Sequence, residues 1–111
     1  MRKIIYLASP YSHPDDDKRQ ENFEKISNIA ADLCAEGKIA FSPITYGHTL
    51  VNFRGSMPTD WPFWKNFCLS FLEVSDELHV CKMEGWNHSR GVAEEIEFAI
   101  KNGITIKYID C

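Results

Sequence analysis

The feature that most constrains the fold is an alternation of short apolar segments, rich in β-branched residues, with longer segments of helical period. Residues 3–8 and 104–109 have the composition of buried strands, while residues 91–101 repeat apolar side chains at helical spacing. Such alternation predicts a parallel sheet with helices on both faces. We therefore expect an α/β fold: a single three-layer domain spanning residues 1–111. It contains a doubly wound parallel sheet of about four to five strands, of the flavodoxin or Rossmann type.

The predicted order is strand, helix, strand, loop, helix, strand, helix, strand. The first helix should open near Pro14 and stop at Gly37, because proline and acids favour a first turn and glycine ends a helix. Residues 44–62 show no clear period, so we expect a long irregular loop of the kind that often forms a lid or binding segment. The remaining expected elements are strands at 39–42 and 77–81 and a helix at about 64–74.

The candidate binding segments lie where the predicted strands end. In open parallel sheets, ligands bind outside the carboxyl ends of the strands. That rule selects residues 9–12, the stretch from Pro43 onward and the loop 82–91, which are also rich in hydroxyls, glycines and aromatic side chains. Trp61 and Trp86 are expected in loops, where an exposed indole indicates a ligand or a partner chain.

The start of the last predicted helix carries the strongest chemical signal. Ser89 and Gly91 stand where free backbone amides and a hydroxyl would form an anion site, and Glu95 follows one turn later. A purely structural interpretation is also open, in which Ser89 caps the helix and its acids only favour the helix dipole.

Composition excludes several classes of function. The net charge of −4, from 12 basic and 16 acidic residues, offers no basic stripe, so no nucleic acid polymer is expected as a partner. No apolar run is long enough for a bilayer, and the 4 cysteines form no CxxC pair, so we expect a cytoplasmic protein with reduced thiols and no membrane contact. The 4 histidines lack metal-ligand spacing, so neither a metal nor a cofactor is expected. The small core favours a homodimer or a larger homo-oligomer.

Two segments resemble the nucleoside 2-deoxyribosyltransferase superfamily. They are Tyr-Leu-Ala-Ser-Pro-Tyr at residues 6–11 and Ser-x-Gly-x-x-x-Glu-x-x-x-Ala at residues 89–99. Phe-Ser-Pro-Ile at 41–44 and the tryptophan-containing segment 85–91 resemble, within it, a group of small bacterial and phage proteins with no assigned activity. The resemblance covers nearly the whole chain in order, including Asp76, and extends to the N-glycosidases that act on nucleoside 5′-monophosphates.

The resemblance implies roles for particular residues. Glu95 matches a nucleophilic glutamate that forms a glycosyl-enzyme ester, and Tyr6 matches a tyrosine that orients that carboxylate. Ser89 stands where deoxyribosyltransferases carry an aspartate that binds a free 5′-hydroxyl. A serine hydroxyl at this position would donate a hydrogen bond to a phosphate, whereas an aspartate would repel it. We therefore expect hydrolysis or transfer at the N-glycosidic bond of a nucleoside 5′-monophosphate. The expected substrate-binding residues are Ser9, Tyr11, Trp86, Ser89 and Gly91.

Cys68 departs from the family pattern. Eight residues before Asp76, the family carries a second acid that manages the proton on the leaving base, and this chain has a cysteine there. Either His48, Asp60 or His88 supplies the proton instead, or the base needs little help, or the glycosidic activity is weak or absent. The last case keeps open a non-catalytic nucleotide-binding or sensing module on the same fold. A third hypothesis, an assembly protein, is prompted by the loop tryptophans.

Overall fold

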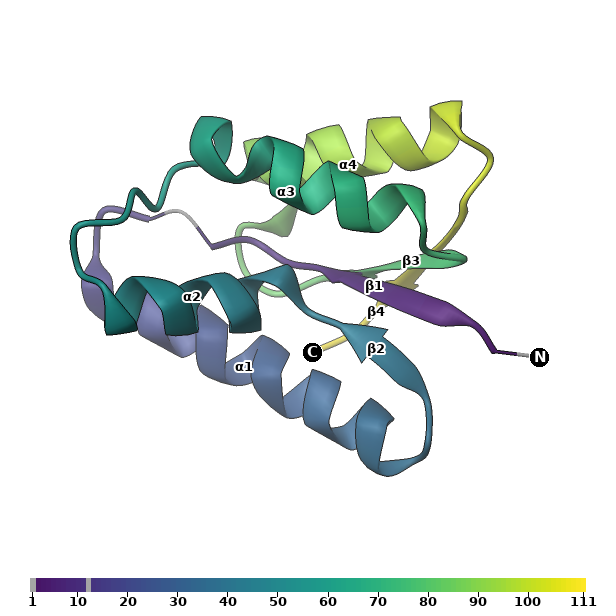
Figure 1. Ribbon diagram of the computed structural model, residues 1–111, viewed down its shortest axis with the longest axis horizontal. Coiled ribbons are helices and arrows are strands. Elements are labelled where there is room, and N and C mark those ends of the chain that lie inside the picture. The colour runs from purple at the N-terminus through teal and green to yellow at the C-terminus, as the bar shows by residue number, and fades with distance from the viewer. Residues whose placement is uncertain (1, 12) are drawn as a thin grey trace.

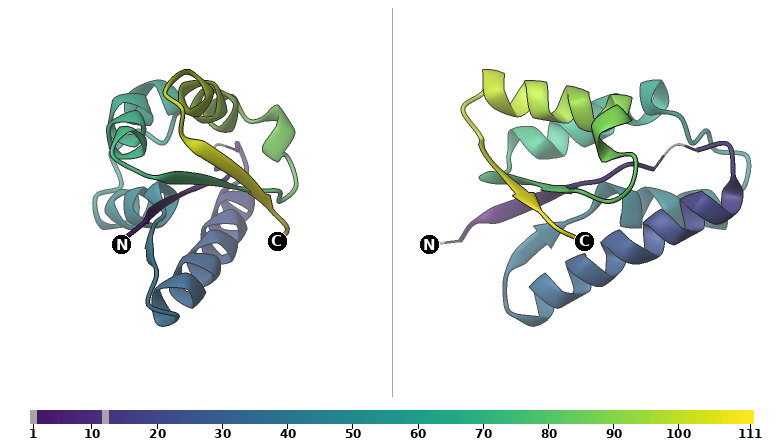
Figure 2. Two further views of the ribbon diagram at one scale, coloured as in Figure 1. Left: turned by 90° about the vertical axis from the view of Figure 1, so that its right-hand side faces the viewer. Right: turned by 180° about the vertical axis from the view of Figure 1, so that it is seen from behind.

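The structure is a computed structural model that describes residues 2–11 and 13–111. Its elements in chain order are β1 (Ile4–Ala8), α1 (Asp16–Ala35), β2 (Ile39–Phe41), α2 (Pro43–Phe53), α3 (Trp61–Glu73), β3 (Glu77–Cys81), a 3₁₀ turn η1 (Trp86–His88), α4 (Arg90–Lys101) and β4 (Thr105–Ile109). The four strands form one parallel sheet in the order β2-β1-β3-β4. Helices α1 and α2 lie on one face and α3 and α4 on the other (Figures 1 and 2). The expected α/β class with a doubly wound parallel sheet is confirmed.

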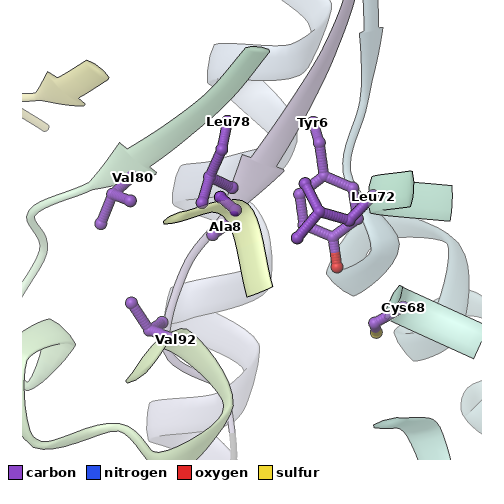
Figure 3. Packing of buried hydrophobic residues seen from close by; sticks show 8 residues of the cluster. Tyr6, Ala8, Cys68, Leu72, Leu78, Val80 and Val92 are labelled. Atoms are coloured by element: carbon purple, nitrogen blue, oxygen red, sulfur yellow. The ribbon is translucent and has the colours of Figure 1, made fainter. Parts of the chain in front are cut away.

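Strand β1 is central because its side chains are apolar on both faces. Tyr6 and Ala8 point into the core beneath α3 and α4, whereas Ile5 and Leu7 point into the core beneath α1. Figure 3 shows the first of these cores, in which Leu78 of β3 lies beside Tyr6 and Ala8 of β1. A strand covered on both sides reads as a continuous apolar run, which is why it was recognisable in the sequence.

The segment 44–62 corrects the sequence prediction, because most of it is helical. Helix α2 runs from Pro43 to Phe53, and α3 begins three residues earlier than expected. The Ser42 hydroxyl caps α2 by accepting an amide hydrogen bond, and Pro43 occupies the first turn. Gly47 weakens a helix by propensity, but here its bare Cα faces the ring of Trp64, 3.5 Å from where a Cβ would stand. Tertiary packing therefore outweighs the local composition.

Three connections between elements meet at one edge of the sheet, where β1, β2 and β3 end. The chain leaves β1 through Ser9, enters α2 directly after β2, and leaves β3 through a turn that reaches α4. Parallel strands bring these carboxyl ends together, as expected. Ser12, the last residue of the first expected binding segment, lies outside the described residues. Along the described part of the chain, no helix is long and apolar enough to cross a membrane.

Candidate active site

A pocket with a volume of about 100 Å³ opens at this edge of the sheet. Its walls come from the loop after β1, from α2 and α3, and from the first turns of α4. Five of the residues that the sequence predicted as functional line it: Ser9, Tyr11, Ser89, Gly91 and Glu95. The sheet end and the helix start thus converge on one cavity.

Tyr6 and Glu95 form a buried pair beside the pocket. Tyr6 is fully buried on β1, and Glu95 on α4 is 4% exposed. The Tyr6 hydroxyl donates a short hydrogen bond to Oε2 of Glu95. Burial raises the pKa of the Glu95 carboxyl to about 8, and the hydrogen bond from Tyr6 acts in the opposite direction. A carboxyl with this pKa ionises near neutral pH, which suits a group that takes part in a reaction.

Cys68 of α3 lies against the same pair. The thiol is 6% exposed and lines the pocket, and Figure 3 shows it on the side of the core that the Tyr6 hydroxyl faces. Burial, followed by the nearby Glu95 carboxylate, raises the pKa of the thiol to about 12. A thiol with that pKa neither ionises nor supplies a proton readily near pH 7, so Cys68 contributes an apolar wall rather than an acid.

The start of α4 and the end of β1 form a polar corner. Ser89 caps α4 by accepting a hydrogen bond from the amide of Val92 at 3.2 Å. Ser9 is 6% exposed, and within the described part of the protein its hydroxyl has no hydrogen-bond partner. A buried hydroxyl without a partner costs about 1–3 kcal/mol, a penalty that a ligand in the pocket would relieve. Free amides at a helix start attract an anion, so this corner suits a phosphate.

Trp61 lines the pocket next to this polar corner. Its ring packs on Gly91, where an added Cβ would stand 3.0 Å from a ring carbon, so this close approach favours glycine. Its indole nitrogen donates to Oε2 of Glu94 at 2.9 Å, and Glu94 also pairs with Lys65 and Arg90. The hydrogen bond from Lys65 lowers the pKa of Glu94. Glu94 is therefore an anchor for the indole, and Trp61 is the first residue of α3 rather than a loop residue.

Helix α2 supplies the wall that sequence reasoning missed. Ile44, Gly47, His48 and Val51 line the pocket, and Trp64 of α3 faces them. The signal that could have found this wall was the pair of residues before it, because serine followed by proline marks a helix start. Once the segment is helical, its residues at helical spacing face the cavity together.

Two other predicted residues lie away from the pocket. Trp86 belongs to η1 and packs on Tyr108 of β4, with ring centroids 5.7 Å apart. The described residues that line the pocket include neither Trp86 nor His88, whereas Asp60 and His48 are among them. The turn after β3 therefore directs the Trp86 indole onto the sheet edge and not toward this pocket. Across residues 2–11 and 13–111, no group of three or more acidic, histidine or cysteine side chains is placed to hold a metal ion.

Comparison with known proteins shows a family and a related fold. The family model described as "Domain of unknown function (DUF1937)" matches residues 3–110. No curated protein matches the sequence. Among solved structures, a 2-deoxyribosyltransferase from the psychrotolerant bacterium Bacillus psychrosaccharolyticus superposes with a TM-score of 0.58 at 20% identity, over 96% of this chain and 72% of that chain. At this identity the likeness shows a shared fold.

Proposed function

We propose that this chain, which belongs to the DUF1937 family of domains of unknown function, hydrolyses the N-glycosidic bond of a nucleoside 5′-monophosphate or transfers its sugar to a second base. The observation that carries the proposal is the buried Tyr6–Glu95 pair beside a pocket that also holds the Ser9 hydroxyl, which has no hydrogen-bond partner among the described residues. The shared fold with a 2-deoxyribosyltransferase supports glycosyl transfer as the reaction class.

In this proposal Glu95 is the nucleophile. Its carboxylate attacks the anomeric carbon, the base leaves with the electron pair of the N-glycosidic bond, and a glycosyl ester forms. Positive charge develops on the sugar in the transition state, which favours the ionised carboxylate. Tyr6 holds one carboxylate oxygen, so that the other is directed to the sugar. Water or a second base then cleaves the ester.

The 5′-phosphate is assigned to the corner formed by Ser9, Ser89 and the first amides of α4. Hydroxyls and amides donate hydrogen bonds to an anion, and the helix dipole adds to that attraction. Ser9 is the independent support, since its buried hydroxyl has no partner within residues 2–11 and 13–111 and the residue lines the same pocket. A free nucleoside has no phosphate to accept hydrogen bonds from the donors in this corner.

The direct test is release of free base from a panel of ribonucleoside and deoxyribonucleoside 5′-monophosphates, with the matching nucleosides as controls. Chromatography should detect base from monophosphates and much less from nucleosides. A second candidate function, nucleotide sensing without turnover, is favoured by Cys68, which stands in place of an acid. Thermal stabilisation by a monophosphate without base release, even at stoichiometric protein, would establish the sensor instead.

Replacing Ser89 with aspartate should turn preference away from monophosphates. We expect kcat/KM for a 5′-monophosphate to fall at least about tenfold, because a carboxylate repels the phosphate, while activity on the nucleoside is retained or rises. Ser89→Asn is the matched control, since aspartate and asparagine both cap helices and only one carries charge. Equal losses on both substrates in the aspartate variant would show that position 89 does not face the phosphate.

Replacing Tyr6 with phenylalanine should shift the pH profile. Tyr6 lowers the pKa of Glu95 through its hydrogen bond, so its loss raises that pKa further and leaves less carboxylate at pH 7. A hydrogen bond to a charged group contributes about 1.5–3 kcal/mol, so kcat/KM at pH 7 should fall roughly 10- to 100-fold. The rising limb of kcat/KM against pH should move to higher pH, with activity recovering there. A uniform loss at every pH would contradict the role.

A further inference from the structure

A chain of hydrogen bonds leads from the pocket to the surface of α1. The Tyr11 hydroxyl contacts Nδ1 of His48, and Nε2 of His48 contacts Oε1 of Gln20 at 2.9 Å. The amide nitrogen of Gln20 in turn donates to Oε2 of Glu24 at 3.2 Å. Phe23 stacks on the imidazole with ring centroids 4.2 Å apart, and His48 is 7% exposed. None of these contacts is needed to explain the Tyr6–Glu95 pair.

The direction of each hydrogen bond in this chain follows from the bond between Gln20 and Glu24, which lies at the surface. Glu24 is a carboxylate and only accepts, so the Gln20 amide nitrogen faces it and the amide oxygen faces His48. Nε2 of His48 therefore carries the hydrogen, and Nδ1 is left with a lone pair. Tyr11 then has to donate its hydroxyl hydrogen to Nδ1. The Tyr11 side chain lines the pocket and also has a hydrogen bond with Arg19, so the remaining lone pair of its oxygen is the position that can accept a proton.

The surroundings keep His48 neutral. Burial, followed by the positive charge of Arg19, lowers the pKa of His48. Burial also raises the pKa of Tyr11, although Arg19 acts against that change. A neutral imidazole whose one hydrogen points away from the pocket is a proton acceptor for the pocket and not a donor.

We propose that Tyr11 and His48 together take the proton from the water that cleaves the glycosyl ester, and that Gln20 is the positioning residue that sets the tautomer. The inference rests on the proposed function and assigns the second half of that reaction. The water oxygen bonds to the anomeric carbon, the bond from that carbon to Glu95 breaks, and Glu95 recovers its carboxylate. The water proton passes to Tyr11 while the Tyr11 proton passes to Nδ1 of His48.

The proton balance closes over the whole reaction. The departed base left with the electron pair of its bond and needs one proton, and the imidazolium of His48 holds one. Returning that proton through Tyr11 to the pocket restores the starting state, with no net proton released. Pairing a base with a hydroxyl relay is the same logic by which a histidine activates a hydroxyl in other hydrolytic sites.

The test separates the two half-reactions. His48→Asn retains an oxygen that accepts the hydrogen bond from Tyr11 but cannot take up a proton, and Tyr11→Phe removes the relay oxygen. With a 5′-monophosphate that the wild type hydrolyses, both variants should release about one equivalent of base per protomer in a burst. Steady turnover should then fall at least about 100-fold. Intact-protein mass spectrometry should show the sugar phosphate bound covalently, and sodium azide, which needs no proton removed, should restore turnover as a glycosyl azide.

Gln20 provides the matched controls. Gln20→Met removes the acceptor for Nε2 of His48 and should slow ester cleavage without removing the burst, whereas Gln20→Glu keeps an acceptor and should retain activity. A burst that disappears together with steady turnover would overturn the assignment, because the network would then serve the first step or only the fold. Thermal unfolding of each variant shows whether the substitution has destabilised the fold. A wild type that releases no base from any nucleotide would overturn the proposed function and this inference together.

Discussion

Glu95→Gln is expected to abolish base release, with a loss of at least about 1,000-fold in kcat, because an amide cannot replace a carboxylate nucleophile. Glutamine has nearly the same shape as glutamate and keeps an oxygen for the hydrogen bond from Tyr6, so the pocket should be preserved. The measurement is the rate of base release at saturating 5′-monophosphate, read from pH 6 to pH 9. Across that range the wild type should gain activity as Glu95 ionises near pH 8.

Glu97→Gln is the matched control for this substitution. Glu97 lies on the same helix, but it is exposed and pairs with Lys101 at 2.8 Å, so the same chemical change there should leave activity within about twofold. Nucleotide binding by the Glu95→Gln variant should persist, as seen from thermal stabilisation by the substrate. Base release that survives in this variant would remove Glu95 from the reaction altogether.

The same Glu95→Gln substitution should stabilise the folded protein, by an amount that depends on pH. The fold raises the pKa of Glu95 from 4.5 to about 8, so the folded state favours the protonated carboxyl. Its stability contribution is fully present below pH 4.5 and is lost as pH rises toward 8, because the unfolded chain ionises first. Neutral glutamine avoids that loss. The shift corresponds to up to roughly 5 kcal/mol in the free energy of unfolding above pH 8.

Urea unfolding at pH 4.5, 6, 7 and 8.5 measures this effect. The difference in free energy of unfolding between Glu95→Gln and the wild type should be small at the lowest pH. It should grow by about 1.4 kcal/mol per pH unit above it. Glu97→Gln makes the same chemical change at an exposed side chain of the same helix and is measured in parallel. A difference for Glu95→Gln that stays constant with pH would show that burial does not hold this carboxyl protonated.

The fold class could be predicted because its signals are local. Strand β1 is apolar at each position that its neighbours bury, and a helical period followed by glycine marks α1 and α4. Parallel strands gather their carboxyl ends at one edge of the sheet, and this rule predicts that Ser9 lies near Ser89. These inferences need only periodicity, end signals and sheet geometry.

The wall formed by α2 could not be predicted by the same means. A glycine, a histidine and two threonines within eleven residues weaken helix propensity, and that composition indicated a loop. Burial of Ile44 against the sheet and the contact of Gly47 with Trp64 stabilise the helix through partners distant in sequence. Helix propensity contributes less to the stability of a helix than such packing does, so the prediction of a loop from the local pattern was wrong.

By itself, the sequence determined the alternation of strands and helices, the edge at which they meet, and the position of a carboxylate one turn into α4. Tertiary structure alone decided the contacts and burial of these groups. It buries Glu95 under the Tyr6 hydroxyl, leaves the Ser9 hydroxyl without a partner in the described part of the chain, and directs Trp86 away from the pocket. The relay from Tyr11 through His48 to Gln20 joins three separate segments. Its direction depends on α1 packing against α2, because hydrogen bonds and desolvation depend on distances that no one-dimensional pattern contains.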